Sequence, residues 1–330
     1  IGANDRVNGS VTLTMEVTST GTCALVSDFM VLDLTPSPAT PPIGGGGLTD
    51  MCVGTPGQFY TVPFNFGNTY QWSVSPAGPV TILGGGVNDN FIVLNFPTSG
   101  VFTLEVIEYS PPPASCPGPT QQITITVYDP PTVDAGSDVT ICQGDATTLG
   151  GTPNGTGASA TGGSGTYAYN WSPSFGLDDA NAEHPVASPI VTTTYTLSVT
   201  DLVSGCTNVT DQVVVTVTPL PVVDAGSNGE TCEGVGIDLS TLAVPPSGSN
   251  YSSLTWTTSG TGTFSDPNIL TPVYTPGAGE TGLVTLTLEA TGNAPCGNVS
   301  DAMQLTVTAA PTANAGSDET TCEGQPFDLS

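Results

Sequence analysis

Short stretches in which apolar and polar residues alternate recur along the chain and predict β-strands. In one of them the apolar positions are Ile123, Ile125 and Val127, and similar stretches lie at 213–217 and 303–307. Because successive side chains of a strand point to opposite faces, this pattern predicts strands with one buried face. No window shows a sustained helical period. Turn residues, with 41 Gly and 30 Pro, separate the stretches, so we predict an all-β fold of sandwich or barrel type.

The cysteine positions reveal an internal repeat of 90 residues. Each alternating stretch begins seven positions after a cysteine, and a different cysteine lies 64 positions before that one. The first cysteines of the repeats are Cys52, Cys142, Cys232 and Cys322, and the second cysteines are Cys116, Cys206 and Cys296. Cys23 is followed by the same stretch and is a further second cysteine. A period of this kind indicates an array of small, similar domains.

Proline-rich stretches at 36–42, 130–131 and 219–221 are the predicted domain boundaries. They divide the chain into the back part of one repeat, three complete repeats and the front part of another. The predicted ranges are 1–35, 36–129, 130–218, 219–309 and 310–330. Short proline-rich connections are stiff, so we expect successive domains to be held in line, end to end.

The cysteine spacing predicts one disulfide inside each complete repeat. The predicted pairs are Cys52–Cys116, Cys142–Cys206 and Cys232–Cys296, with the partners of Cys23 and Cys322 outside the sequence given. An alternative joins cysteines across a boundary, as in Cys116–Cys142. Metal ligation is a weaker alternative, because the chain has no CxxC pair and only one histidine. Disulfides place the protein in an oxidising compartment.

Each complete repeat has one tryptophan between its cysteines, at Trp72, Trp171 and Trp256. A buried tryptophan beside a disulfide, in a domain of about 90 residues, is typical of immunoglobulin-like sandwiches. We therefore predict tandem immunoglobulin-like β-sandwich domains, with the three tryptophans in their cores. The alternative for these aromatic residues is an exposed platform on which sugars stack.

The charge balance excludes several classes of partner. There are 29 acidic residues and one basic residue, Arg6. Such a field repels nucleic acid and anionic lipid, so neither is an expected partner. Without lysine, Lys–Asn isopeptide cross-links cannot form. No apolar stretch is long enough to insert into a membrane, and any targeting signal or anchor is expected outside the sequence given.

Residues suited to catalysis are few. The one histidine, His184, lies in a turn-rich segment and is interpreted as a surface residue of a loop. Asp178 and Asp179 are adjacent, so the sequence does not fix the separation between carboxylates that a catalytic pair needs. The glycine runs at 44–47 and 84–86 lack the lysine of a phosphate-binding loop. We predict no catalytic site and no organic cofactor, so the chain is not expected to be an enzyme.

Acidic residues that recur just after the boundaries raise the hypothesis of a calcium site. They are Asp134, Asp138, Asp224 and Asp318. Calcium needs several oxygen ligands, which two neighbouring domains could supply together. Asparagine replaces the acid at two of the corresponding positions. The alternative is that these side chains cap turns of their own backbone.

Several motifs resemble a known family of repeats. They are V-D-A-G-S-D from residue 133, Y-N-W-S-P from residue 169 and T-T-T-Y-T-L-S-V-T-D from residue 192. These motifs resemble the PKD-like and Ig-like repeats of large Bacteroidota cell-surface proteins, such as gliding-motility adhesins exported by type IX secretion. The resemblance covers nearly the whole chain and is weakest at 43–129. It implies an extracellular protein on the outer membrane exterior, with no catalytic residues.

The expected function is that of a non-catalytic extracellular stalk, which holds the adhesive part of a giant bacterial adhesin away from the cell. One alternative is a subunit of an extracellular filament or sheath, assembled through exposed edge strands. A third is a set of accessory carbohydrate-binding modules of a secreted enzyme. The expected partners are other repeats of the same chain, with surface polysaccharide or further copies of the chain as alternatives.

Overall fold

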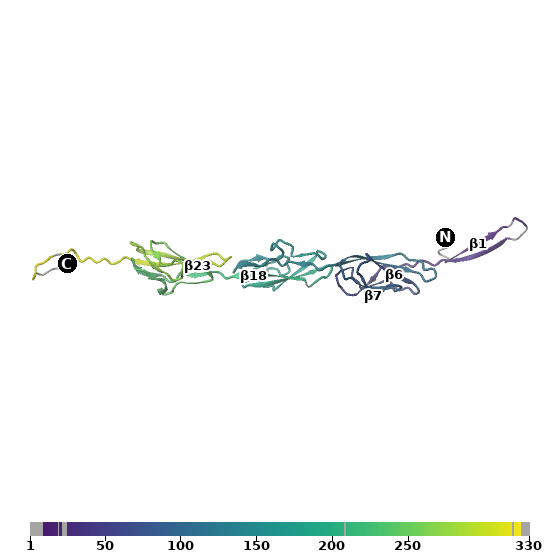
Figure 1. Cartoon of the computed structure of the whole chain (residues 1–330), viewed down its shortest axis with the longest axis horizontal. Coiled ribbons are helices and arrows are strands. Elements are labelled where there is room, and N and C mark those ends of the chain that lie inside the picture. Colours follow the sequence, from purple (N-terminus) through teal and green to yellow (C-terminus); the bar gives the residue numbers. More distant parts are fainter. Residues whose placement is uncertain (1–8, 19, 22–24, 208, 319, 325–330) are drawn as a thin grey trace. The chain divides into compact units, whose positions relative to one another are not determined.

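The computed structural model describes residues 9–18, 20–21, 25–207, 209–318 and 320–324. These residues form β-strands, turns and one short 3-10 helix, η1 (Leu239–Thr241), so the predicted all-β class is confirmed (Figure 1). Contacts group the chain into two compact units. The first unit comprises 1–137, 148–186 and 194–213, and the second comprises 138–147, 187–193 and 214–330.

The first unit begins with an antiparallel hairpin. Its strands are β1 (Ser10–Val17) and β2 (Val26–Asp33), and Ser10 lies opposite Asp33. Apolar side chains such as Met15 and Phe29 are two-thirds exposed on this hairpin.

A β-sandwich of two four-stranded sheets follows in the first unit. One sheet has the order β4 (Asp50–Cys52), β10 (Gln121–Tyr128), β9 (Gly100–Tyr109) and β6 (Thr69–Ser75). The other has the order β3 (Gly44–Gly45), β5 (Gln58–Thr61), β8 (Phe91–Asn95) and β7 (Thr81–Gly85). All neighbours are antiparallel except β4 and β10, which are parallel. The core between the sheets includes Met51, Tyr60, Ile92, Leu104 and Ile125.

The predicted repeat 130–218 contributes strands to both units. In the first unit, β11 (Thr132–Val133) pairs with β14 (Ala160–Thr161), and β15 (Tyr167–Ser172) pairs with β17 (Thr193–Asp201). In the second unit, β12 (Val139–Cys142) runs parallel to the end of β18 (Val209–Thr218). Two short strands complete the set, β13 (Thr147–Thr148) and β16 (Val186–Ala187).

The second unit also contains a sandwich with the same parallel edge. Its large sheet has the order β20 (Gly229–Cys232), β27 (Val299–Thr308), β26 (Gly282–Gly292) and β23 (Tyr251–Thr258). Smaller sheets are formed by β21 (Ile237–Asp238), β25 (Val273–Thr275) and β24 (Thr263–Phe264), and by β19 (Val222–Asp224) with β22 (Ser247–Ser249). Here the first strand of the large sheet in sequence, β20, again lies parallel to the last, β27. The core includes Leu239, Trp256, Tyr274, Leu286 and Leu305.

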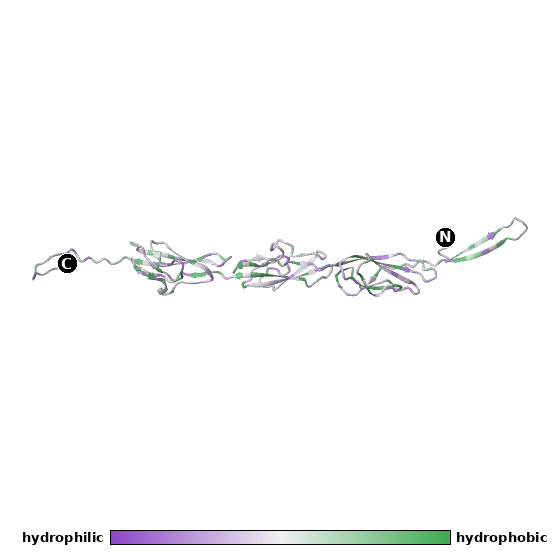
Figure 2. Ribbon diagram, viewed as in Figure 1, coloured by the Kyte–Doolittle hydropathy of each residue, from purple (hydrophilic) through white to green (hydrophobic). Residues whose placement is uncertain are grey.

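The alternating stretches of the sequence have the structure that they predict. The stretches at 123–127, 213–217 and 303–307 lie in β10, β18 and β27. Their apolar residues face inward, with Ile125, Val215 and Leu305 fully buried, and the strands carry much of the hydrophobic sequence in Figure 2. Packing of a sheet against the core buries one face of each strand and leaves the other in solvent, which is the arrangement that alternation requires.

The tryptophans differ from one repeat to another. Trp171 and Trp256 are each 2% exposed, so their predicted place in the core is confirmed. Trp72 is only half-buried and packs against the edge of its core. Its indole Nε1 donates a hydrogen bond to the carbonyl oxygen of Asp89, at 2.9 Å.

Candidate functional site: the disulfide joints

Two disulfides link different repeats to each other. They join Cys52 to Cys206 and Cys142 to Cys296, each across 154 positions. The first cysteine of one repeat is therefore bonded to the second cysteine of the next. The predicted pairs Cys52–Cys116, Cys142–Cys206 and Cys232–Cys296 are wrong, and so is the alternative pair Cys116–Cys142.

The parallel register of the edge strand explains why a repeat does not close on itself. Cys52 lies opposite Tyr128 at the end of β10, whereas Cys116 precedes the first residue of that strand, Gln121. An eight-residue strand is about 26 Å long at 3.3 Å per residue. A disulfide needs Cα atoms within about 7 Å, so Cys52 cannot reach Cys116. The observed Cα distance between Cys52 and Cys206 is 5.1 Å.

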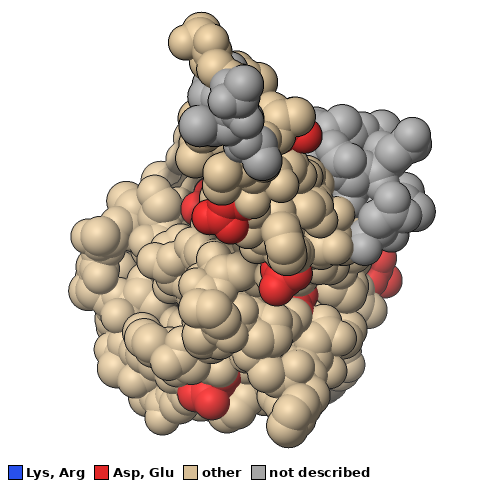
Figure 3. Space-filling view, turned by 90° about the vertical axis from the view of Figure 1, so that its right-hand side faces the viewer, with Lys and Arg blue, Asp and Glu red and all other residues tan. Residues whose placement is uncertain are grey.

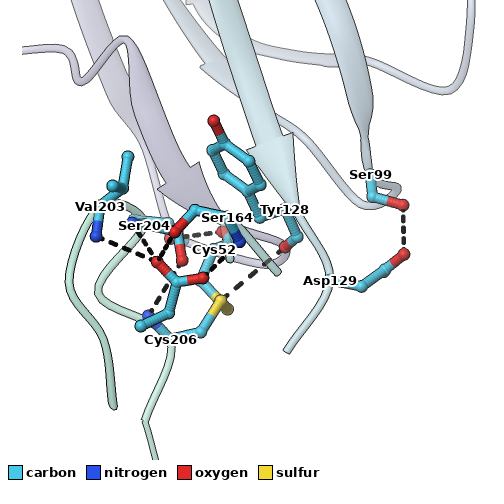
Figure 4. Close-up of a disulfide and its surroundings, with 10 residues drawn as sticks. Cys52, Ser99, Tyr128, Asp129, Ser164, Val203, Ser204 and Cys206 are labelled. Carbon is cyan, nitrogen blue, oxygen red and sulfur yellow. Dashed lines mark hydrogen bonds between the residues drawn. A yellow bond between two sulfur atoms is a disulfide. The ribbon is translucent and has the colours of Figure 1, made fainter. Parts of the chain in front are cut away.

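The first joint consists of the residues around the Cys52–Cys206 bond in the first unit. After Tyr128 the backbone continues through Asp129 into the next repeat, so β4 and β10 both end there. Cys206 lies in the loop between β17 and β18, and its Sγ atom is 3.8 Å from the carbonyl oxygen of Tyr128 (Figure 4). The Asp129 carboxylate accepts a hydrogen bond from the hydroxyl of Ser99. Peptide chain and disulfide thus cross this joint side by side.

The second joint repeats this arrangement within the second unit. Cys142 ends β12 opposite Thr218, the last residue of β18. Cys296 lies in the loop between β26 and β27, with its Sγ atom 3.5 Å from the carbonyl oxygen of Thr218. The hydroxyl of Thr218 also lies 3.4 Å from the carbonyl oxygen of Ala294. The same joint therefore occurs twice in this chain, so the connection between successive repeats is itself repeated.

A buried carboxylate holds the cysteine loop of the first joint in shape. Asp201 is fully buried and accepts hydrogen bonds from the amide and hydroxyl of Ser164 and from the amides of Val203 and Ser204, at 2.5–3.0 Å (Figure 4). Its own amide donates to the carbonyl oxygen of Cys206. Burial alone raises the pKa of Asp201, but these hydrogen bonds outweigh it and lower the pKa to about 2.

We expect Asp201→Asn to lower the free energy of unfolding by about 2 kcal/mol at neutral pH, because the depressed pKa measures how far the fold favours the charged form. The carboxylate contributes fully above pH 4 and loses its contribution as the pH falls towards 2. Denaturant unfolding between pH 2 and 7 should therefore show a pH dependence that Asp201→Asn removes. Asp89→Asn, an exposed carboxylate, is the matched control. Equal pH profiles for Asp201→Asn and the native chain would contradict this role.

The carboxylates proposed as calcium ligands engage the backbone. Asp134 and Asp224 each accept a hydrogen bond from the glycine amide two residues later, at 2.9 and 2.8 Å. Asp138 accepts from the amide of Val214, and Asp318 is exposed outside any strand. Within the described ranges, no three His, Cys, Asp or Glu residues gather closely enough to hold a metal ion. The acidic side chains visible in Figure 3 are likewise scattered. The contacts of Asp134 and Asp224 agree with the turn-capping alternative, whereas Asp138 bonds a strand 76 positions away.

The V-D-A-G-S-D motif from residue 133, which recurs as V-D-A-G-S-N from residue 223, ties the start of a repeat to its last strand. Ala135 is fully buried, and its amide donates to the carboxylate of Asp211 at 2.9 Å. In the next repeat, the amide of buried Ala225 donates to Asp301 at 2.8 Å. Both pairs are 76 positions apart. The motif therefore has a structural function that its composition alone did not show.

The titratable groups of the interior have structural partners. Among the described residues, the buried carboxylates are Glu108 and Asp201, which belong to different predicted repeats. Glu108 accepts hydrogen bonds from the side-chain amides of Asn65 and Asn68, at 2.7 and 2.6 Å. His184 is half-buried, with its Nδ1 atom 3.3 Å from a backbone carbonyl oxygen. Side-chain amides, hydroxyls and backbone groups surround these residues, as expected of residues that stabilise a fold.

No protein-family model matches the chain, and no curated protein sequence does. Solved structures that are similar include Sidekick-1 immunoglobulin domains 1–5, with 12% identity, a TM-score of 0.35 and coverage of 89% of this chain and 66% of that chain. The insect immune protein hemolin has 12% identity, a TM-score of 0.32 and coverage of 88% and 80%. Mouse protocadherin-24 EC1-3 has 14% identity, a TM-score of 0.32 and coverage of 82% and 99%.

No helix in the described part of the chain has the length and apolar character needed to cross a membrane. The sandwich at 44–128 is formed by two four-stranded sheets, and in one of them the first strand in sequence, β4, lies parallel to the last, β10. The chain is accordingly built of tandem immunoglobulin-like β-sandwich repeats, with disulfides that connect successive repeats.

Proposed function

We propose that this chain is a tension-bearing, non-catalytic spacer in the extracellular stalk of a bacterial cell-surface adhesin. The observation that supports the proposal is the double covalent connection at each joint, where a disulfide accompanies the peptide chain. A spacer that holds an adhesive part away from a cell must transmit force from one domain to the next. A second covalent link at each joint keeps the ends of neighbouring domains together under such a load.

The two disulfides also protect the chain against cleavage, because their loops overlap. One loop runs from Cys52 to Cys206 and the other from Cys142 to Cys296. A single backbone cut anywhere between Cys52 and Cys296 therefore leaves one covalent molecule. This property suits a protein exposed to proteases outside the cell. An oxidising location is also where such bonds persist.

The proposal includes a location on the exterior of the outer membrane, as part of a gliding-motility adhesin exported by type IX secretion in a member of the Bacteroidota. The motif resemblance supports this finer assignment. Electron microscopy of intact producing cells, labelled with antibody against the segment 219–309, tests it. We expect label along thin surface fibres and none on cells that lack the gene. Fibres thicker than one chain would favour the filament alternative, and label confined to the culture medium would overturn the stalk.

A second candidate function, binding of a neutral polysaccharide, is favoured by the exposure of Trp72. The half-buried indole borders a hollow of about 340 Å³ that Gln71, Asn88 and Tyr109 also line. The Tyr109 hydroxyl donates to the side-chain oxygen of Gln71 at 3.0 Å, which leaves the Gln71 NH₂ group for a ligand. The exposed part of an aromatic ring suits the apolar face of a sugar ring. With 29 acidic residues and one basic residue, an uncharged glycan is favoured over an acidic one.

Calorimetric titration with cellohexaose and with polygalacturonate tests this candidate. We expect binding of the neutral oligosaccharide alone, and a loss of about tenfold or more in Gln71→Ala and Trp72→Ala, because each removes a side chain that lines the hollow. Phe66→Ala is the control, since Phe66 is 95% exposed and does not line the hollow. Gln71→Ala keeps the test valid if Trp72→Ala unfolds. If no neutral oligosaccharide binds the native chain, this candidate is wrong.

A further inference from the structure

We propose that Cys116 and Cys232 are the open halves of two more joints, each formed with another repeat of the same kind. The inference deepens the proposed function, on which it rests, by naming the chemistry and the partner of these two thiols. Both cysteines are free in the structure. Cysteines at the same positions of other repeats form the observed disulfides, so the chain itself contains the precedent for such joints.

Cys232 has the surroundings of Cys52 and Cys142. Each of these three residues is the last of an edge strand that runs parallel to the final strand of its repeat, and their strand partners are Tyr128, Thr218 and Thr308. In each case the amide of the next residue donates to the carbonyl oxygen of that strand partner, at 2.8–2.9 Å. In each case the amide three residues beyond the cysteine also donates back to its carbonyl oxygen. The backbone thus presents Cys232 as it presents the two bonded cysteines.

Cys116 corresponds to Cys206 and Cys296. All three lie in the loop that connects the two long strands of a large sheet. The carbonyl oxygen of Cys116 accepts a hydrogen bond from the amide of Ser110, at 3.0 Å, as that of Cys206 does from Asp201 at 2.9 Å. Cys206 and Cys296 are buried, whereas Cys116 is half-exposed. This difference in exposure is expected if a preceding repeat covers each bonded loop, whereas no preceding repeat covers the loop of Cys116 among the described residues.

The partner of each thiol is set by position. Both observed joints combine a strand-end cysteine with a loop cysteine of the next repeat. Cys232 is therefore matched to a loop cysteine, and Cys116 to a strand-end cysteine. Bond formation joins the two sulfur atoms and removes two protons and two electrons. Dioxygen or a thiol–disulfide oxidant of the extracellular compartment accepts the electrons. We expect a neighbouring repeat of the same chain as the partner, since the joints seen here are of that kind.

Disulfide mapping on the native protein, isolated from its producing cells under alkylating conditions, tests the inference. We expect the Cys232 peptide to be bonded to a loop cysteine of another repeat, and the Cys116 peptide to a strand-end cysteine. Both thiols should resist iodoacetamide until the protein is reduced. A molecular mass that stays that of one chain without reductant identifies a neighbour in the same chain, whereas covalent multimers that reductant separates identify a second copy as the partner.

Free, alkylated Cys232 and Cys116 would overturn the inference, as would pairing of Cys232 with another strand-end cysteine. Serine variants provide an independent measurement in the chain of residues 1–330 itself. Cys232→Ser and Cys116→Ser should leave the Cys52–Cys206 and Cys142–Cys296 peptides unchanged. If the native protein contains those two bonds while its Cys232 is free, only this inference fails. If the two bonds are themselves absent, the proposed spacer function loses its main support.

Discussion

When the oxidised chain is pulled from one point before Cys52 and one point after Cys296, its extended length is expected to be far shorter than that of the reduced chain. The shortest covalent path between these cysteines passes through both disulfides and through the backbone that separates Cys142 from Cys206, which are 64 positions apart. At about 3.5 Å per residue, this path spans about 220 Å when fully extended. After reduction the path contains 244 positions, or about 850 Å.

Removing one disulfide and removing both are expected to increase the contour length by unequal steps, so the measured steps show which disulfides are present. Replacing one disulfide by serines, in Cys52→Ser/Cys206→Ser, lengthens the path only to 90 positions, because the other bond still closes its loop. Loss of both bonds lengthens it to 244 positions. Single-molecule force spectroscopy measures these contour lengths directly. The matched control is Cys116→Ser/Cys232→Ser, which removes two free thiols and should not change the length. A full extension of the oxidised native chain would contradict the pairing.

The second large effect is expected in equilibrium stability. Removing the Cys52–Cys206 bond should lower the free energy of unfolding of the repeats that it joins by about 5 kcal/mol, because the unfolded chain regains the freedom of a loop of 154 residues. For a unit of this size the melting temperature should fall by roughly 10 °C or more. Calorimetry and chemical denaturation of Cys52→Ser/Cys206→Ser measure the loss.

Cys116→Ser/Cys232→Ser serves again as the control, since it makes the same chemical change without breaking a bond. The sandwich at 44–128 has its own core around Leu104 and Ile125, so its β-sheet circular dichroism should survive at low temperature in the variant. A melting curve of Cys52→Ser/Cys206→Ser that coincides with that of the control would contradict a stabilising role for the joint.

Much of the architecture was predictable because its causes are local. Alternation within β10, β18 and β27 reflects one buried and one exposed face, which any strand at the surface of a core requires. The 90-residue period identified the repeats. The core positions of Trp171 and Trp256 followed from one large aromatic residue per repeat. Turn capping by Asp134 and Asp224 involves residues two positions apart, so it was available as an alternative from the sequence.

The features that the sequence did not reveal depend on which distant segments meet. The exposure of Trp72 depends on how its strand lies against the core, and the anchor between Ala135 and Asp211 joins residues 76 positions apart. A spacing pattern contains no direct signal for such contacts. In the sequence, a separation of 64 recurs as regularly as the separation of 154 that the bonded cysteines share, so spacing alone does not choose between the two pairings.

The sequence by itself determined that this protein is an all-β array with a period of 90 residues and an oxidised cysteine pattern, because strand alternation and repetition are properties of neighbouring positions. Only the tertiary structure decided which cysteines meet. The parallel pairing of Cys52 with Tyr128 carries the first cysteine to the end of the repeat where the chain leaves, while the second cysteine stays at the other end of the same strand. A strand length separates them, so each bonds a neighbouring repeat.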